Sequence, residues 1–263
     1  MPAGASSEKE SRREDWETFW AEKQEVSQVY SNADRILRNL LHVTDLKGKR
    51  VLEIGAGTGR DSFPVVRHGA IVFQLDYAEG SLRILKKLAA ESNLPVQIVG
   101  GDTFRLPFRD EAFDVVFHQG LLEHFRSPEA EALLRENVRV LKRGGYLLVD
   151  VPQRYHLYTI AKRILIALNR WFAGWERSFS IRELTSLVQS LGLEPVHTYG
   201  EWMYPSFLYR SIREVLKRFG IRTPLNPQLF GPLTRARAAV RSRLRETPLS
   251  LYSGISIGVV GKK

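Results

Sequence analysis

The chain has 263 residues, enough for one sizeable domain with extensions, and 43% of them are hydrophobic and 26% charged, as in soluble globular proteins. It contains no cysteine, which excludes disulfides and thiolate metal sites. The net charge of +10 lies in residues 203–263, which hold 12 Lys and Arg against 2 Asp and Glu, whereas residues 1–202 hold 27 of each kind. Such a basic segment could attract nucleic acid, an anionic lipid surface or an acidic substrate.

The first fifteen residues are polar and lack the apolar core of a secretory signal. No uninterrupted apolar run approaches the ~18 residues that a membrane-spanning helix needs. We therefore expect a cytoplasmic protein, in peripheral contact with the inner membrane surface if its basic segment binds lipid.

The patterns along the chain predict five parts. Residues 1–14 are expected to be a disordered tail, and residues 15–45 an N-terminal helical cap, because apolar side chains recur there at helical spacing. Residues 46–202 form an α/β core, residues 203–250 a basic helical insertion or lid, and residues 251–263 the final strand of the core.

Within the core, short apolar runs alternate with helical patterns. The predicted strands are 51–56, 70–76, 96–102, 113–120, 146–152 and 195–203, and the predicted helices are 60–69, 78–93, 127–142, 155–172 and 180–194. Ser127 is a plausible cap with Pro128 at the first helical position, and the glycine pair at 144–145 ends that helix. Ser180 and Glu183 have the spacing of a capping box. The alternation predicts a parallel sheet that helices cover on both faces.

The stretch VLEIGAGTGRD, residues 51–61, joins the first strand of the core to a helix through three glycines, Gly55, Gly57 and Gly59. Open α/β sheets bind ligands at this end of the strand, and glycines let a ligand approach the backbone closely. A dinucleotide is one class of ligand for such a loop, which would make the protein a dehydrogenase that binds NAD. Glu53 inside the strand suits a cationic or neutral ligand better than a pyrophosphate.

Two further acids follow the next two strands. Asp76 ends the second strand, where a carboxylate can accept the hydroxyls of a ribose, so it does not discriminate between ligand classes. Asp102 ends the third strand, where it could accept a hydrogen bond from an adenine amino group. Acids after successive strands give one cleft a negative charge, which fits a nucleoside that carries a sulfonium.

With these motifs in this order, the chain resembles the class I S-adenosylmethionine-dependent methyltransferases, and within them a small-molecule and ubiquinone-biosynthesis-like subgroup. The resemblance covers residues 49–152 and extends more loosely to residue 193. VLEIGAGTGR, GDTFRLPF, FDVVFHQGLLEHF and RVLKRGGYLLVDVP carry it. It implies a doubly wound, seven-stranded, mostly parallel sheet whose last strand, at 254–263, is antiparallel.

The resemblance also implies the cofactor, S-adenosyl-L-methionine, with S-adenosyl-L-homocysteine as the product, and no metal. The implied cofactor-binding residues are Glu53, Gly55, Ala56, Gly57, Gly59, Asp76, Tyr77, Gly101, Asp102, Thr103, Gln119 and Gly120. Tyr30 or a neighbour would cap the cofactor from the N-terminal helices.

Methyl transfer is an in-line displacement that needs alignment, exclusion of water and, for a hydroxyl or ammonium acceptor, a base. We expect the base to be His118 or His124, which lie at and after the end of the fourth strand. Weaker candidates are Glu123, Asp150 and His156. On the substrate side, the candidates are Trp175, Glu176, Arg177 and Tyr204.

Three functions are open for the basic, partly apolar segments 155–172 and 204–245. They could dock on an anionic membrane and reach a lipid-like acceptor, bind RNA, or form a lid whose apolar residues are core. RNA is the weakest, because no RNA-binding module is recognisable. We expect methylation of a small or lipid-like acceptor, at oxygen. The alternatives are an RNA methyltransferase and a non-catalytic binding protein on the same fold, and the oligomeric state is open.

Overall fold

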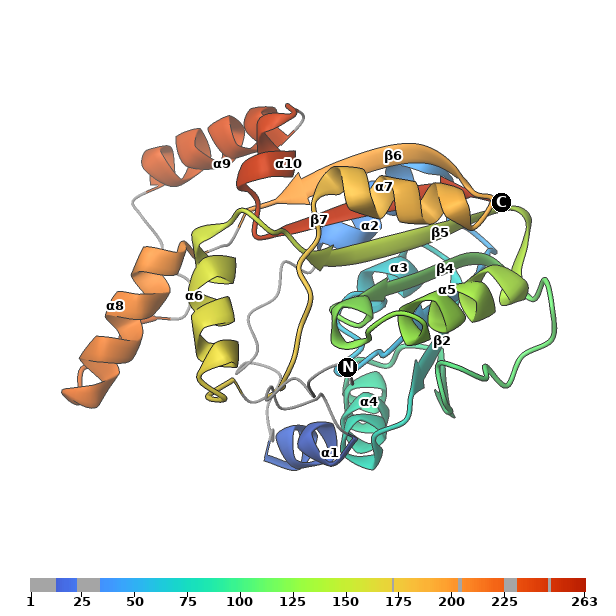
Figure 1. Cartoon of the computed structure of the whole chain (residues 1–263), viewed down its shortest axis with the longest axis horizontal. Helices are drawn as coiled ribbons and strands as arrows, with labels where there is room; N and C mark the ends of the chain where they lie inside the picture. The colour runs from blue at the N-terminus through green and yellow to red at the C-terminus, as the bar shows by residue number, and fades with distance from the viewer. Residues whose placement is uncertain (1–12, 23–33, 172, 203–204, 225–230, 246) are drawn as a thin grey trace, which may run out of the picture.

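A single mixed sheet of seven strands organises the protein (Figure 1). The computed structural model describes residues 13–22, 34–171, 173–202, 205–224, 231–245 and 247–263. The strands are β1 Arg50–Ile54, β2 Ile71–Asp76, β3 Val96–Gly100, β4 Phe113–Gln119, β5 Leu141–Pro152, β6 Glu194–Glu201 and β7 Ser256–Lys262. They lie in the order β3-β2-β1-β4-β5-β7-β6, so the predicted doubly wound, mostly parallel fold is confirmed.

The last strand runs against its neighbours, as the resemblance implied. β7 pairs antiparallel with both β5 and β6, with Val149 opposite Val259, whereas β1 to β5 pair parallel. The carboxyl ends of these parallel strands therefore meet at one edge. The strand order reverses between β1 and β4, which is where open α/β sheets bind ligands.

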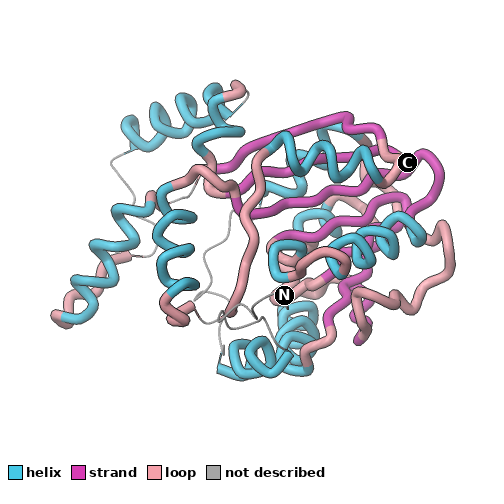
Figure 2. Tube along the Cα trace, in the orientation of Figure 1, coloured by secondary structure: helices cyan, strands magenta, loops and turns pink. Residues whose placement is uncertain are grey.

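Helices cover both faces of the sheet (Figure 2). The α-helices are α1 Arg13–Glu22, α2 Asp34–Val43, α3 Phe63–Arg67, α4 Glu79–Glu91, α5 Glu129–Val140, α6 Leu157–Ala167, α7 Ile181–Ser190, α8 Phe207–Arg218, α9 Gly231–Arg245 and α10 Leu249–Ser253. A 3-10 turn, η2 Leu122–His124, follows β4. No helix in the described parts of the chain is long and apolar enough to cross a membrane.

Side-chain alternation along each strand sends apolar residues to two separate cores. Leu52 of β1 packs with α5 and α7, whereas its neighbour Val51 packs with α2 and α3 on the other face. Such strands, buried on both sides, are read from sequence as continuous apolar runs. The helices hold the sheet rigid, and its carboxyl edge is left to loops.

Three predicted boundaries are corrected by the structure. Ser127 does not cap α5, because the helix begins one residue later with Pro128 at the cap position and no side-chain hydrogen bond there. The helix ends at Val140, and the glycine pair at 144–145 lies within β5, where Gly144 has a φ of 73° beside a register shift. The helix after the glycine loop is also shorter than predicted, spanning only Phe63–Arg67.

The N-terminal helices do not act together as a cap. α1 lies beside α4 at the carboxyl edge of the sheet (Figure 1). α2 instead packs its apolar face, including Ile36 and Leu40, against the sheet and forms part of the second core. Of these two helices, α1 is the one whose side chains, Trp16 and Trp20, line the cavity at the glycine loop.

Candidate functional site

The glycine loop after β1 has the backbone geometry that its composition favours. Gly55, Gly57 and Gly59 all have positive φ, between 55° and 65°, a conformation that L-residues rarely adopt. A Cβ on Gly57 would lie 2.8 Å from the ring of Trp20, and one on Gly59 would lie 2.2 Å from the amide of Gln74. The absence of a side chain at Gly57 therefore lets α1 lie close to the loop, and its absence at Gly59 lets the loop pack on β2.

Asp76 ties this loop to the end of β2. Its carboxylate accepts hydrogen bonds from the amides of Gly57 at 2.8 Å and Ala78 at 2.9 Å. Burial raises the pKa of Asp76, and the hydrogen bonds from Ala78 and Gly57 oppose this shift. Each carboxylate oxygen can accept a second hydrogen bond, so the same group can still hold ligand hydroxyls.

A cavity of about 700 Å³ opens at this edge of the sheet. Eleven of the twelve predicted cofactor residues line it, namely Glu53, Gly55, Ala56, Gly57, Asp76, Tyr77, Gly101, Asp102, Thr103, Gln119 and Gly120. Gly59 is the exception, because it packs against Gln74 and Leu85 instead. The cavity is large enough for a nucleoside-sized ligand.

One end of the cavity is acidic. Glu53 is buried, and burial together with the neighbouring Asp61 raises its pKa well above the ordinary value. Burial raises the pKa of Asp61 to about 6, against the opposing charges of Arg35 and Arg60. Oε2 of Glu53 and Oδ1 of Asp61 are buried and accept no hydrogen bond within the protein. Two such carboxylates favour a ligand that brings a cation or several hydrogen-bond donors.

The other end follows β3. Asp102 is exposed and accepts a hydrogen bond of 2.9 Å from the amide of Phe104, which fixes its side chain at the cavity wall. The hydroxyl of Thr103 beside it is buried and has no partner within the protein. Both groups can therefore bond the polar edge of a base.

The residues present fit the implied cofactor, S-adenosylmethionine. The unpartnered carboxylate oxygens of Glu53 and Asp61 would bind the ammonium group of this cofactor. Asp76 would accept its ribose hydroxyls, and Asp102 and Thr103 would bond the edge of its adenine. Trp16 and Trp20 of α1 close the cavity from outside. Gly55 and Gly57 line the cavity with backbone alone, whereas Gly59 packs on Gln74.

A second cavity of about 270 Å³ adjoins the first, and Gln119 and Gly120 line both. Gly120 has a φ of 68°, and Oε1 of Gln119 is buried without a partner in the protein. The remaining walls carry charged and aromatic side chains, namely Arg35, Glu123, Asp150, Tyr158, Lys162, Trp171, Glu176 and Arg210. A ligand in the second cavity would therefore lie next to a ligand in the first cavity, at Gln119 and Gly120.

Glu123 is the carboxyl group of this second cavity that keeps an unpartnered buried oxygen, Oε2. Only 4% of the residue is exposed, although the sequence ranked Glu123 among the weaker candidates for the base. Burial, and then the charge of Glu176, raises the pKa of Glu123 to about 8. The 3-10 turn η2 folds it inward, and the amide of Arg177 holds its carbonyl at 2.8 Å.

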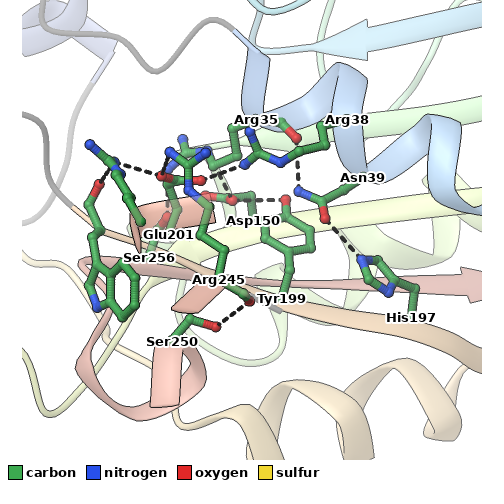
Figure 3. Close-up of polar contacts among 12 residues, drawn as sticks. Arg35, Arg38, Asn39, Asp150, His197, Tyr199, Glu201, Arg245, Ser250 and Ser256 are labelled. Atoms are coloured by element: carbon green, nitrogen blue, oxygen red, sulfur yellow. Dashed lines mark hydrogen bonds and ion pairs between the residues drawn. The ribbon is translucent and has the colours of Figure 1, made fainter. Parts of the chain in front are cut away.

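The other two carboxyls are engaged. Glu176 forms a buried ion pair with Lys162 and accepts a hydrogen bond of 2.5 Å from the indole of Trp171. Asp150 lies 3.3 Å from the guanidinium of Arg35. Asp150 also accepts a hydrogen bond of 2.9 Å from the hydroxyl of Tyr199 (Figure 3).

The two predicted histidines lie in different places. His124 lines the first cavity, packs on Trp16 at 4.8 Å between ring centroids, and has its Nδ1 4.0 Å from Glu176. Burial lowers its pKa to about 4 despite that carboxylate, so it is neutral near pH 7. His118 is fully buried, and burial lowers its pKa to about 3. It lines neither cavity of the described residues, which argues against its role as a base.

The remaining candidates are dispersed. Trp175 stacks under the guanidinium of Arg126, and Arg177 pairs with Glu183, so neither lines either cavity. His156 caps α6 by accepting from the amide of Tyr158. Two further candidates, Tyr30 and Tyr204, lie outside the described residues.

Sequence reasoning missed Asp61, Trp16 and Trp20 in the first cavity and Lys162 in the second. Asp61 follows the glycine loop directly, so its position and its charge could have identified it as a residue of the first cavity. The tryptophans show only the apolar spacing of a helix, which does not say what the helix covers.

Comparisons with known proteins agree with this geometry. Residues 52–149 match a family model described as a methyltransferase domain. The chain is 31% identical over 168 residues to a ubiquinone biosynthesis O-methyltransferase of Dinoroseobacter shibae, covering 62% of this chain and 67% of the relative. It is 30% identical over 182 residues to the enzyme of that name from a Ruegeria species, covering 66% and 71%.

Solved structures share the fold at lower identity. A SAM-dependent methyltransferase from Thermotoga maritima superposes with a TM-score of 0.59 at 21% identity, covering 95% of each chain. Magnesium protoporphyrin IX methyltransferase from Synechocystis, solved with bound SAH, gives 0.57 at 15% identity and covers 95% of this chain and 93% of its own.

Proposed function

Since this chain belongs to the class I S-adenosylmethionine-dependent methyltransferases, we propose that it transfers the methyl group to a hydroxyl oxygen of a small, lipid-like acceptor. The comparisons support neither of two alternatives raised by the sequence, a dehydrogenase and a non-catalytic binding protein. The observation that carries the proposal is the second cavity, which meets the cofactor cavity at Gln119 and Gly120 and holds Glu123. The curated relatives are named as O-methyltransferases, which supports oxygen as the acceptor atom.

Glu123 is the group that we propose as the base. When bound, S-adenosylmethionine would supply a methyl carbon that accepts an electron pair from the acceptor oxygen. The bond from that carbon to the positively charged sulfur would break at the same time and leave S-adenosylhomocysteine. An acceptor hydroxyl in the second cavity gives its proton to Oε2 of Glu123, and its oxygen forms the new bond to carbon. A raised pKa makes the ionised carboxylate of Glu123 a stronger base, and this ionised form predominates above about pH 8.

The other residues position the acceptor and exclude water. Trp16 and Trp20 cover the cofactor side, and the Lys162–Glu176 pair forms a charged wall on the acceptor side. His124 lies between the two sides and is neutral, so it can donate or accept a hydrogen bond without a charge. Alignment in a dry site supplies much of the rate in such displacements.

The test is a transfer assay with labelled S-adenosylmethionine and alkyl-substituted catechols, with the matching anilines and a bulk tRNA as alternative acceptors. We expect a product with the mass of one added methyl group on oxygen. The rate should rise as the pH rises through about 8, because Glu123 must lose its proton to act. Transfer to the anilines or to tRNA, with none to the catechols, would overturn the proposal.

A matched pair of variants tests the base. Glu123→Gln keeps the shape of the side chain and should lower kcat about 10²-fold or more, with the pH dependence near 8 lost. Glu129→Gln makes the same change at an exposed position six residues along, in the first turn of α5, and should leave the rate unchanged. Equal rates for both variants would remove Glu123 from this role.

A further inference from the structure

α6 exposes most of its aliphatic side chains, whereas a helix of the core would bury them. Thr159 and Lys162 face inward and are buried, whereas Leu157 is 73% and Ile164 58% exposed. With Ile160 and Leu168, which are also exposed, the outward aliphatic side chains follow helical spacing and form one stripe. Of the three alternatives for this segment, a lid whose apolar residues are core is therefore the least favoured. Ile166 is buried, but the inward face also carries Lys162, which pairs with Glu176.

α8 repeats this arrangement. Leu208, Ile212, Val215 and Phe219 are spaced along one face and are between 48% and 75% exposed. Scattered exposed aliphatic residues are ordinary in soluble proteins, but an exposed aliphatic stripe on each of two helices is typical of a binding surface. Both helices lie beyond the carboxyl edge of the sheet, together with α9 (Figure 1).

The polar residues of these helices carry charge of one sign. The sequences of α6 and α9 contain no Asp or Glu, and that of α8 contains only Glu214. Exposed basic residues on the three helices include Arg163, Arg218, Arg235 and Arg243. Apolar stripes flanked by basic residues are typical of helices that lie in the headgroup region of a bilayer.

α9 reaches this end of the molecule through a buried anchor. Glu201, which is fully buried at the end of β6, binds Arg245 at 2.7 Å (Figure 3). The same carboxylate binds Arg241 at 2.8 Å. Arg38 of α2 binds the same carboxylate at 2.6 Å. The anchor uses two arginines of α9 and leaves Arg235 and Arg243 exposed on the same helix.

We propose that the exposed side chains of α6, α8 and α9, here called the docking face, bind the surface of an anionic lipid bilayer. The apolar stripes would enter the headgroup region, and the arginines would pair with anionic lipids. α6 and α8 also wall the second cavity, α6 through Tyr158 and Lys162 and α8 through Arg210, so a docked molecule would hold that cavity close to the lipid. Aliphatic side chains predominate in the stripes, whereas a surface for single-stranded RNA needs aromatic rings for stacking. The docking face does not depend on which acceptor the enzyme methylates.

Vesicle co-sedimentation of the full chain tests this. We expect binding to vesicles of phosphatidylcholine with phosphatidylglycerol, weak binding to phosphatidylcholine alone, and loss of binding as salt screens the charges. A variant with Arg163→Glu, Arg218→Glu and Arg235→Glu should bind at least about 10²-fold more weakly, since each basic residue near an anionic surface contributes about fivefold. Ile164→Asp with Val215→Asp should weaken binding about tenfold or more while the melting temperature stays unchanged.

The control pair is Arg67→Glu with Ile71→Asp, two exposed positions at the amino edge of the sheet, and it should bind vesicles like the wild type. Failure of the wild type to bind anionic vesicles at low salt, or equal binding by face and control variants, would overturn the proposal. So would a self-association that Ile164→Asp abolishes without vesicle binding, or RNA binding tighter than vesicle binding. Methyl transfer to a water-soluble catechol is measured separately, so failure of the proposed function and failure of docking are distinguishable.

Discussion

The amide of Gly57 donates a hydrogen bond of 2.8 Å to the carboxylate of Asp76, which fixes the glycine loop of β1 to the end of β2. The bond couples two motifs nineteen residues apart, so the loop geometry depends on the acid that also faces the cofactor cavity. One side chain thus shapes the site and is placed to bind within it.

Asp76→Ala should therefore lose affinity for S-adenosylmethionine by two routes, the ligand contact and the loop geometry. We expect the dissociation constant to rise about 100-fold, since hydrogen bonds to charged groups are worth about 1.5–3 kcal/mol each. Calorimetric titration measures it. Asp45→Ala, which removes an exposed aspartate that also accepts a backbone amide, is the control and should leave the affinity unchanged. Unaltered binding by the Asp76 variant would show that Asp76 does not contact the cofactor.

Gly57→Ala should weaken cofactor binding more than its backbone strain alone accounts for. The added Cβ would lie 2.8 Å from the ring of Trp20, so α1 must shift away from the cavity. Gly48→Ala is a matched control, because Gly48 also has positive φ, 72°, but open space around it. Both changes should cost about 1 kcal/mol of stability. Only Gly57→Ala should also alter tryptophan fluorescence and the cofactor dissociation constant. Equal effects of the two variants on both readouts would contradict this.

The sequence predicted the residues of this site that lie at the ends of successive strands, but not the contacts between distant parts of the chain. The residues that line the first cavity at the ends of β1 to β4 were predictable, because strand order and short loops bring successive strand ends to one edge. The contact between Trp20 and Gly57 was not, because nothing local to either residue encodes it. The sequence also did not predict which of the candidates for the base lines a cavity. Glu123 and His118 lie five residues apart, yet one lines a cavity and the other is enclosed by the sheet.

The orientation of α6 shows a second limit. Helical spacing in a sequence defines two faces, but not which one turns inward. The burial of Lys162 depends on Glu176 and on the second cavity, so only the tertiary structure reveals it. Apolar periodicity was therefore sufficient to locate this helix and insufficient to assign its surface. By contrast, the Ser180–Glu183 capping box is a local feature, and the structure confirms it.

Cofactor affinity should depend on pH through the acidic end of the first cavity. The pKa of Asp61 is raised to about 6, so the group is mainly protonated below that pH and mainly charged above it. A ligand ammonium is attracted only by the charged form of Asp61, so binding should lower the pKa of Asp61. For each unit by which the pKa falls, the affinity should rise by up to about tenfold between about pH 5 and about pH 7. Asp61→Asn should flatten this rise. A wild-type affinity that is constant over this range would show that Asp61 does not interact electrostatically with the bound ligand.

Glu201→Gln should destabilise the protein, because it leaves three arginines around a neutral side chain. Glu201 is fully buried, whereas Arg38, Arg241 and Arg245 have side chains that are 42%, 18% and 25% exposed. Breaking a buried pair costs about 3–5 kcal/mol, and the partly hydrated arginines place this case near about 3 kcal/mol. Urea unfolding of the variant beside Glu194→Gln, the same change at the exposed start of β6, measures the difference. If α9 is held by this anchor, limited proteolysis should also cut the Glu201 variant within α9 faster than the control. Equal unfolding midpoints and equal cleavage rates would show that the buried carboxylate is not what fixes α9 to the core.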